Sequence, residues 1–106
     1  MATFVLSYRV PQDYTPGQPE AVAAWTGWFE STGARRVDPG HGVVESGSLG
    51  NIGPGTRLGG DSVVTADDLE AAVAVASGCP SPAPGGGVEV GMIAEANQRP
   101  RLAAAD

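Results

Sequence analysis

Residues 62–80 read Ser-Val-Val-Thr-Ala-Asp-Asp-Leu-Glu-Ala-Ala-Val-Ala-Val-Ala-Ser-Gly-Cys-Pro, and this stretch decides the fold. It opens with strand-forming residues, and the strand signal extends back to about Leu58. From Leu69 onward, apolar residues recur at spacings of three and four, which is typical of an amphipathic helix. Gly78 can end that helix, and Pro80 prevents its continuation. The stretch therefore predicts a strand followed closely by a helix.

The start of this helix has a capping pattern, Thr65-Ala66-Asp67-Asp68. We expect the Thr65 hydroxyl to accept a hydrogen bond from a backbone N–H in the first turn, while Asp68 reaches back toward the cap. The sequence therefore places the N-cap at Thr65.

The N-terminal half repeats these two periodicities. Residues 3–10 alternate between two faces, which predicts a strand. Residues 20–32 have an apolar stripe at helical spacing that includes Trp25, Trp28 and Phe29. Because a helix stripe of this kind faces the protein interior, we expect these three aromatic side chains to lie in the core.

The remaining segments have weaker signals. Residues 34–38 and 42–46 are two short strand-like pieces, separated by a turn or bulge at 39–42. Residues 47–60 are rich in glycine and predict a long irregular loop. Residues 88–93 alternate again and predict a last strand.

The order strand, helix, strand, strand, helix, strand indicates an α+β, ferredoxin-like βαββαβ fold. It places two helices on one face of a four-stranded antiparallel sheet. The other face carries Val5 and Ile93 and has no cover from its own chain, so we expect a homodimer, packed sheet to sheet or through swapped edges. Residues 1–94 would form this domain, and residues 95–106 a flexible or partner-packing C-terminal tail.

Composition excludes several classes of function. The 106 residues include 12 acidic and 6 basic side chains, a net charge of −6, and every basic residue is arginine. Such a chain repels phosphate backbones and anionic lipids, so we expect no nucleic-acid or membrane partner. Cys79 is the single cysteine, which fits a reducing compartment. Without a signal-peptide pattern or an apolar run of about 20 residues, the sequence predicts a cytoplasmic protein.

The second half resembles a known family. Residues 57–73 are similar to the corresponding part of the YCII-related, DGPF-type domains, and residues 78–80 and 85–90 are similar to that family's helix exit and last strand. Residues 25–29, followed by Gly33, resemble its first helix. The resemblance implies a dimeric α/β barrel with a cleft between the helix starts and the open sheet face.

Most members of that family have no assigned activity. The resemblance implies that some relatives are lactone isomerases or dehalogenases that use a His and an Asp, and that others are encoded near sigma factors of the extracytoplasmic-function type. This chain departs from the pattern, because the start of its first helix holds Glu20 and no His. Residues 50–56 take the place of the Asp-Gly-Pro-Phe motif. The catalytic residues of those relatives are therefore not carried over.

Four side chains are candidates for a ligand cleft: Tyr8, His41, Arg57 and Glu89. His41 is the single histidine, so imidazole acid–base chemistry would depend on it; the alternative is a surface turn. Arg57 would clamp a carboxylate or pair with Glu45 or Glu89. Glu89 alternates away from the covered face, where it would act as a base or form an interface salt bridge. His41 and Glu89 are thus the catalytic candidates.

Three functions stay open at this point. The first is a small-molecule-binding homodimer of the YCII-related family with no assigned reaction. The second is a cofactor-free isomerase, lyase or oxygenase that acts on a small carbonyl or lactone compound. The third is a non-catalytic accessory or regulatory protein. We expect no cofactor, because the glycine-rich run 53–60 precedes a strand rather than the helix of a dinucleotide site, and no metal, because one His and one Cys do not make a site.

Overall fold

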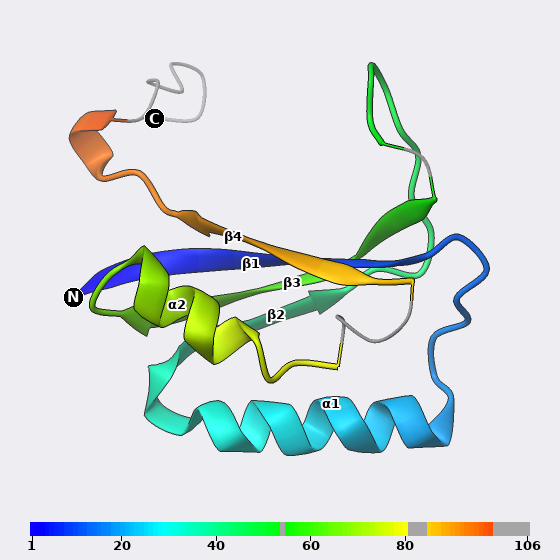
Figure 1. Cartoon of the computed structure of the whole chain (residues 1–106), viewed down its shortest axis with the longest axis horizontal. Coiled ribbons are helices and arrows are strands. Elements are labelled where there is room, and N and C mark those ends of the chain that lie inside the picture. Colours follow the sequence, from blue (N-terminus) through cyan, green and yellow to red (C-terminus); the bar gives the residue numbers. More distant parts are fainter. Residues whose placement is uncertain (54, 81–84, 99–106) are drawn as a thin grey trace.

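The computed structural model of the chain describes residues 1–53, 55–80 and 85–98. Within these residues the main elements follow the predicted order (Figure 1). They are β1 (Ala2–Pro11), α1 (Pro19–Thr32), β2 (Arg36–Gly42), β3 (Thr56–Ala66), α2 (Leu69–Ala76) and β4 (Gly87–Met92), with short 3₁₀ turns η1 (Gly33–Arg35) and η2 (Ala96–Gln98).

The strands form one four-stranded antiparallel sheet in the order β2-β3-β1-β4. Both α1 and α2 lie on the same side of it (Figure 1). This arrangement confirms the predicted α+β, ferredoxin-like fold. We call the side that carries the helices the helix face and the opposite side the open face.

The core lies between the sheet and the helices. Successive side chains of a strand point to opposite faces, and β1 follows this rule along its length. Phe4, Leu6, Tyr8 and Val10 are buried on the helix face. Val64 of β3 is also fully buried, and Phe4, Leu6, Tyr8 and Val64 pack with Trp28 of α1 and with Ala72 and Ala76 of α2.

The sequence predicts two separate strand pieces in residues 34–46, whereas the structure has one strand there, β2. It runs unbroken through Pro39 and Gly40, and the expected irregularity is a bulge rather than a turn, because the register of β2 against β3 shifts between Asp38 and His41. The strand β3 begins at Thr56, whose partner is Pro11 of β1. The loop predicted over residues 47–60 is therefore shorter, since its last five residues belong to β3.

The N-cap of α2 is Asp68, so the prediction of Thr65 is wrong. The Asp68 carboxylate accepts a hydrogen bond from the backbone N–H of Ala71 at 2.8 Å. Thr65 lies within β3 opposite Thr3, and its hydroxyl donates to the carbonyl oxygen of Arg35. Because β3 continues to Ala66, the chain stays extended past Thr65 and the helix begins later than the capping pattern suggested.

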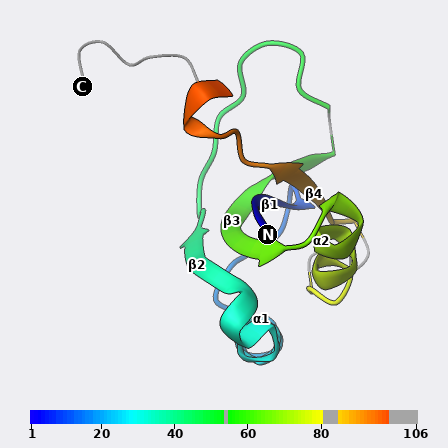
Figure 2. The ribbon, with the colours of Figure 1, turned by 90° about the vertical axis from the view of Figure 1, so that its left-hand side faces the viewer.

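The open face has no covering layer within the described residues. Val5 and Val63 are neighbours there and are half-buried. The loop that joins β2 to β3 rises on this side, as does the chain that follows β4 (Figures 1 and 2). Three apolar side chains of the loop are largely in solvent, with Val44 73%, Leu49 92% and Ile52 51% exposed.

The predicted tail is described only in part. Residues 96–98 form η2, where the backbone N–H of Gln98 donates to the carbonyl oxygen of Glu95. The rest of the predicted tail, residues 99–106, lies outside the described residues. Among the helices of the described part, none has the length and apolar character needed to cross a membrane.

Candidate functional site

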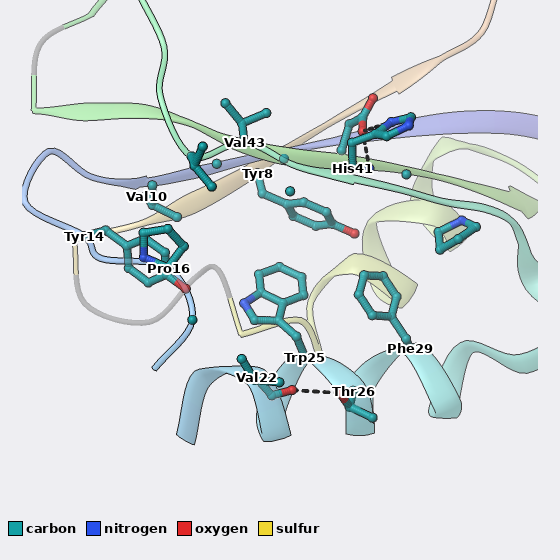
Figure 3. A pocket seen from close by; sticks show the side chains of 18 residues that line it. Tyr8, Val10, Tyr14, Pro16, Val22, Trp25, Thr26, Phe29, His41 and Val43 are labelled. Carbon is teal, nitrogen blue, oxygen red and sulfur yellow. Dashed lines mark hydrogen bonds and ion pairs between the residues drawn. The ribbon is translucent and has the colours of Figure 1, made fainter. Parts of the chain in front are cut away.

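A cavity of about 400 Å³ lies between α1 and the helix face of the sheet (Figure 3). We call it the α1 cavity. Its walls come from β1, from the loop that follows β1, from α1, and from facing parts of β2 and β3 with the residues just after β2. Its lining residues are Tyr8, Val10, Tyr14, Pro16, Gly17, Val22, Trp25, Thr26, Phe29, Pro39, Gly40, His41, Gly42, Val43, Val44, Gly59, Gly60 and Asp61.

Glycines in the sheet create this space. Gly40 and Gly42 of β2 and Gly59 and Gly60 of β3 line the cavity without projecting side chains into it. The strands need two of these glycines for close approach. Gly40 has a φ of +78°, and a Cβ atom there would overlap the carbonyl oxygen of Asp61. A Cβ atom at Gly60 would lie 2.6 Å from the carbonyl oxygen of His41.

Aromatic rings form the opposite wall. Tyr8 meets Trp25 edge to face, with ring centroids 4.6 Å apart, and the centroids of Trp25 and Phe29 are 5.8 Å apart. Trp28 is buried, as predicted for the core. Trp25 and Phe29 pack against the core but are only partly buried, so part of each ring is left to line the cavity. Rings held by several neighbours offer a rigid apolar surface at low entropic cost.

The phenol of Tyr8 is the unusual polar group of the cavity. Tyr8 is only 3% exposed, and its hydroxyl oxygen has no hydrogen-bond partner among the described residues. The neighbouring Ser62 hydroxyl already donates to the carbonyl oxygen of Pro39 at 2.8 Å. Burial raises the pKa of Tyr8 to about 12, while the Ser62 side chain lowers it in part. The phenol is therefore neutral at physiological pH and can donate a hydrogen bond.

Arg57 supports the mouth of the cavity from outside. Its guanidinium donates to the carbonyl oxygen of Tyr14 at 2.8 Å, and more weakly to those of Val43 and Leu58 at 3.5 and 3.4 Å. Tyr14 and Val43 line the cavity, whereas Arg57 does not. The side chain therefore links two separate segments of the wall. Such multidentate binding of carbonyl groups suits a planar guanidinium.

His41 lies at the edge of the cavity, and its imidazole is 85% exposed. Its Nδ1 atom is 3.8 Å from the Asp61 carboxylate, and its backbone N–H donates to the same oxygen at 3.0 Å. His41 is the sheet partner of Asp61, and Asp61 is the partner of Ser7. These residues belong to the open face, because Ser7 points away from the face that carries Tyr8.

Glu89 is exposed in β4 opposite Ser7, so it lies on the open face in the same transverse row as His41. The two residues are on opposite edge strands of the sheet. Of the four candidates from the sequence, Tyr8 and His41 line the α1 cavity, while Arg57 and Glu89 do not. The structure therefore does not bring the four side chains together.

Sequence reasoning missed most of the lining residues, among them Tyr14, Pro16 and Val22. A signal for the cavity existed in the sequence: a helix stripe with three large aromatic residues faces strands that contain paired glycines. Large side chains that face glycines indicate unfilled space. This signal can be used only when it is known which strands the helix packs against.

Within the described residues, no group of three or more His, Cys, Asp or Glu side chains is placed to hold a metal ion. Comparison of the chain with known protein families, with curated proteins and with solved structures finds no match. The local chemistry is therefore the basis for a functional assignment. An apolar, aromatic cavity with one buried hydroxyl donor is suited to binding a small organic molecule.

Proposed function

We propose that this chain is a small-molecule-binding protein that acts as a homodimer, with its ligand site in the α1 cavity. The single observation that supports ligand binding is the cavity of about 400 Å³ whose walls include partly buried aromatic rings and an unpartnered buried hydroxyl. Its lining residues Val22 and Val44 are exposed, so the space is a cleft open to solvent, and a cleft of this size with aromatic walls is suited to a small organic ligand.

The positions of the titratable groups favour binding over catalysis. General acid–base chemistry requires a group within hydrogen-bond reach of the reacting atoms. The His41 imidazole is largely in solvent and belongs to the open face, as does Glu89. Tyr8, the buried polar group of the cavity, is on the other face. The enzyme alternative, an isomerase, lyase or oxygenase, would need these groups to meet around one substrate.

Membership of the YCII-related family is part of the same proposal. The ferredoxin-like strand order is the arrangement that this resemblance implies. The homodimer draws support from the open face, where half-buried Val5 and Val63 lie beside small and polar residues. The loop on the same side carries exposed Leu49 and Ile52, which would gain from contact with a second copy. A two-fold dimer brings identical surfaces together and so needs only one such face per chain.

Ligand binding is tested by filling the cavity. Thermal unfolding of the wild-type protein is measured with and without a set of neutral one-ring and two-ring aromatic compounds, since binding to the folded state raises Tm. Val22→Trp places a large ring at the cavity wall, and we expect it to abolish the Tm increase. Ala23→Trp is the matched control, because Ala23 is exposed on the same helix and does not line the cavity. Equal responses of both variants would contradict the assignment of the site.

The homodimer is tested separately by measuring molar mass in solution. We expect a mass of two chains for the wild-type protein and of one chain for Val63→Glu, which places a carboxylate on the open face. Val73→Glu is the control, because Val73 is 49% exposed on α2, away from that face. A wild-type protein with the mass of one chain at high concentration would refute the dimer and leave the ligand site untouched.

A further inference from the structure

The α1 cavity contains a feature that its apolar walls do not explain, which is the Tyr8 hydroxyl. A buried O–H group without a partner costs free energy, and buried polar groups in folded proteins nearly always have one. Tyr8 is 97% buried and lines the cavity, and its hydroxyl oxygen has no partner among the described residues. Figure 3 shows the Tyr8 ring above Trp25, with its hydroxyl directed toward the Phe29 end.

Two neighbouring hydroxyl groups already donate to backbone carbonyl groups. The Ser62 hydroxyl donates to the carbonyl oxygen of Pro39. The hydroxyl of Thr26, which also lines the cavity, donates to the Val22 carbonyl oxygen of its own helix at 2.8 Å. The Ser62 oxygen can still accept while its proton is donated, so a ligand atom would compete with it for the Tyr8 donor. The Tyr8 hydroxyl nevertheless makes no hydrogen bond within the described residues, and a ligand acceptor would supply one.

The charges around the cavity restrict the ligand further. None of the arginine residues in the described part of the chain lines the cavity, and the guanidinium of Arg57 is occupied by backbone carbonyl groups. Asp61 and His41 are at its edge, with the carboxylate on the open face. An ionised carboxylate entering this space would lose its hydration without meeting a cation, which is strongly unfavourable.

We propose that the α1 cavity selects neutral, flat aromatic molecules that carry one hydrogen-bond acceptor oxygen, such as an aryl ketone, and that the Tyr8 hydroxyl donates to that oxygen. This inference rests on the proposed function, since it names the ligand class of the same site. The ring of the ligand would lie against Trp25 and Phe29, where edge-to-face and offset contacts are available. The acceptor oxygen would supply the partner that Tyr8 lacks.

The test uses three probes of matched shape: 2-ethylnaphthalene, 2-acetonaphthone and 2-naphthoate. Their dissociation constants for the wild-type protein are measured by isothermal titration calorimetry. We expect the ketone to bind about tenfold more tightly than the hydrocarbon, because it satisfies a buried donor. We expect the carboxylate to bind at least about tenfold more weakly than the ketone.

Two variants test whether the preference for the ketone over the hydrocarbon depends on the Tyr8 hydroxyl. Tyr8→Phe removes only the hydroxyl, and we expect it to bind the ketone and the hydrocarbon equally. Ser31→Ala removes a hydroxyl of α1 that donates to the Trp28 carbonyl oxygen and does not line the cavity, and we expect it to retain the wild-type preference. If Tyr8→Phe does not fold, the comparison of ketone and hydrocarbon on the wild-type protein still decides whether a donor selects the ligand.

The outcomes separate this inference from the proposed function. Equal binding of the ketone and the hydrocarbon by the wild-type protein would overturn the selection by Tyr8 while leaving a ligand cavity in place. A ketone preference that persists in Tyr8→Phe would also overturn it, since another donor would then be responsible. Failure of all three probes to bind at millimolar concentration would overturn the cavity as a ligand site, and the inference with it.

Discussion

The two helices lie on the same face of one sheet, yet they pack against it differently. The helix α2 presents Ala72 and Ala76, which are 0% and 1% exposed, to a core that includes fully buried Phe4 and Leu6. The helix α1 presents large aromatic side chains, and a cavity of about 400 Å³ is left between it and the strands. The distance between packed elements depends on the side chains at their contact.

This difference shows how one short chain separates stability from binding. Small residues on α2 allow close contact with the sheet, where Ala72 and Ala76 are almost completely buried. Trp25 and Phe29 on α1 hold that helix away from strands whose glycines add no side chains, so the space between them stays unfilled. The strand β1 contributes to both the core and the cavity, since Leu6 lies in the hydrophobic core and Val10 lines the cavity.

The largest expected effect on stability comes from truncating a side chain in the core beneath α2. Leu6→Ala should lower the free energy of unfolding by about 2–5 kcal/mol, the usual cost of deleting buried methyl groups and leaving a hole. Val10→Ala on the same strand should cost no more than about half as much, because a side chain beside a void has already lost contacts on that side. Urea denaturation measures both. Equal losses would mean that the two regions are packed alike.

A second comparison adds atoms instead of removing them. Ala72→Leu should destabilise the protein by about 1–3 kcal/mol, since the contact between α2 and the sheet has no space for them. Val22→Leu adds volume at the cavity, where Val22 is 51% exposed, and its effect should stay within about 0.5 kcal/mol. Denaturation midpoints of the two variants are the measurement. A large loss for Val22→Leu would argue against an open cavity in solution.

The two helix starts also differ. The Asp68 carboxylate caps α2, whereas Gln18 precedes α1 and makes no side-chain capping bond. Asp68→Ala should therefore reduce the free energy of unfolding by about 1 kcal/mol, and Gln18→Ala by no more than a few tenths, that is ~0.3 kcal/mol. Thermal unfolding of both variants provides the check. If Gln18→Ala were the more harmful change, the start of α1 would have a stabilising contact of another kind.

The fold was predictable from the sequence because its signals are local and agree with one another. Alternation over residues 3–10 and helical spacing from Leu69 fixed the type of each element, and the order of the elements determined the sheet topology. The N-cap of α2 was missed for a tertiary reason. Pairing of Thr65 with Thr3 keeps the chain extended, and no local pattern reveals how far a strand ladder continues.

The site was less predictable, since it depends on which faces meet. The sequence identified Tyr8 and His41, which line the cavity, but it grouped them with Arg57 and Glu89. Residue chemistry alone does not show that Arg57 is occupied by carbonyl groups of distant segments. Alternation does place Glu89 on the open face, yet only the strand order shows that it lies across the sheet from His41.

The last prediction concerns the titration of Tyr8, a residue of the cavity wall. It changes the free energy of unfolding at alkaline pH and has the smallest effect on it at neutral pH. Burial raises its pKa from 10.0 to about 12 in the folded protein. Between these values the unfolded chain has already lost the phenol proton and the folded chain still holds it, so the free energy of unfolding should fall as pH rises. Tyr8→Phe should show a smaller decline over that range and the same pH dependence below it, while Tyr14 titrates in both proteins. Urea denaturation at a series of alkaline pH values provides the slopes. Parallel slopes for the two proteins would mean that the Tyr8 phenol is not buried in solution. The contrast between the close packing of Ala72 and Ala76 of α2 and a cavity with a buried donor beside α1 would then be contradicted at Tyr8.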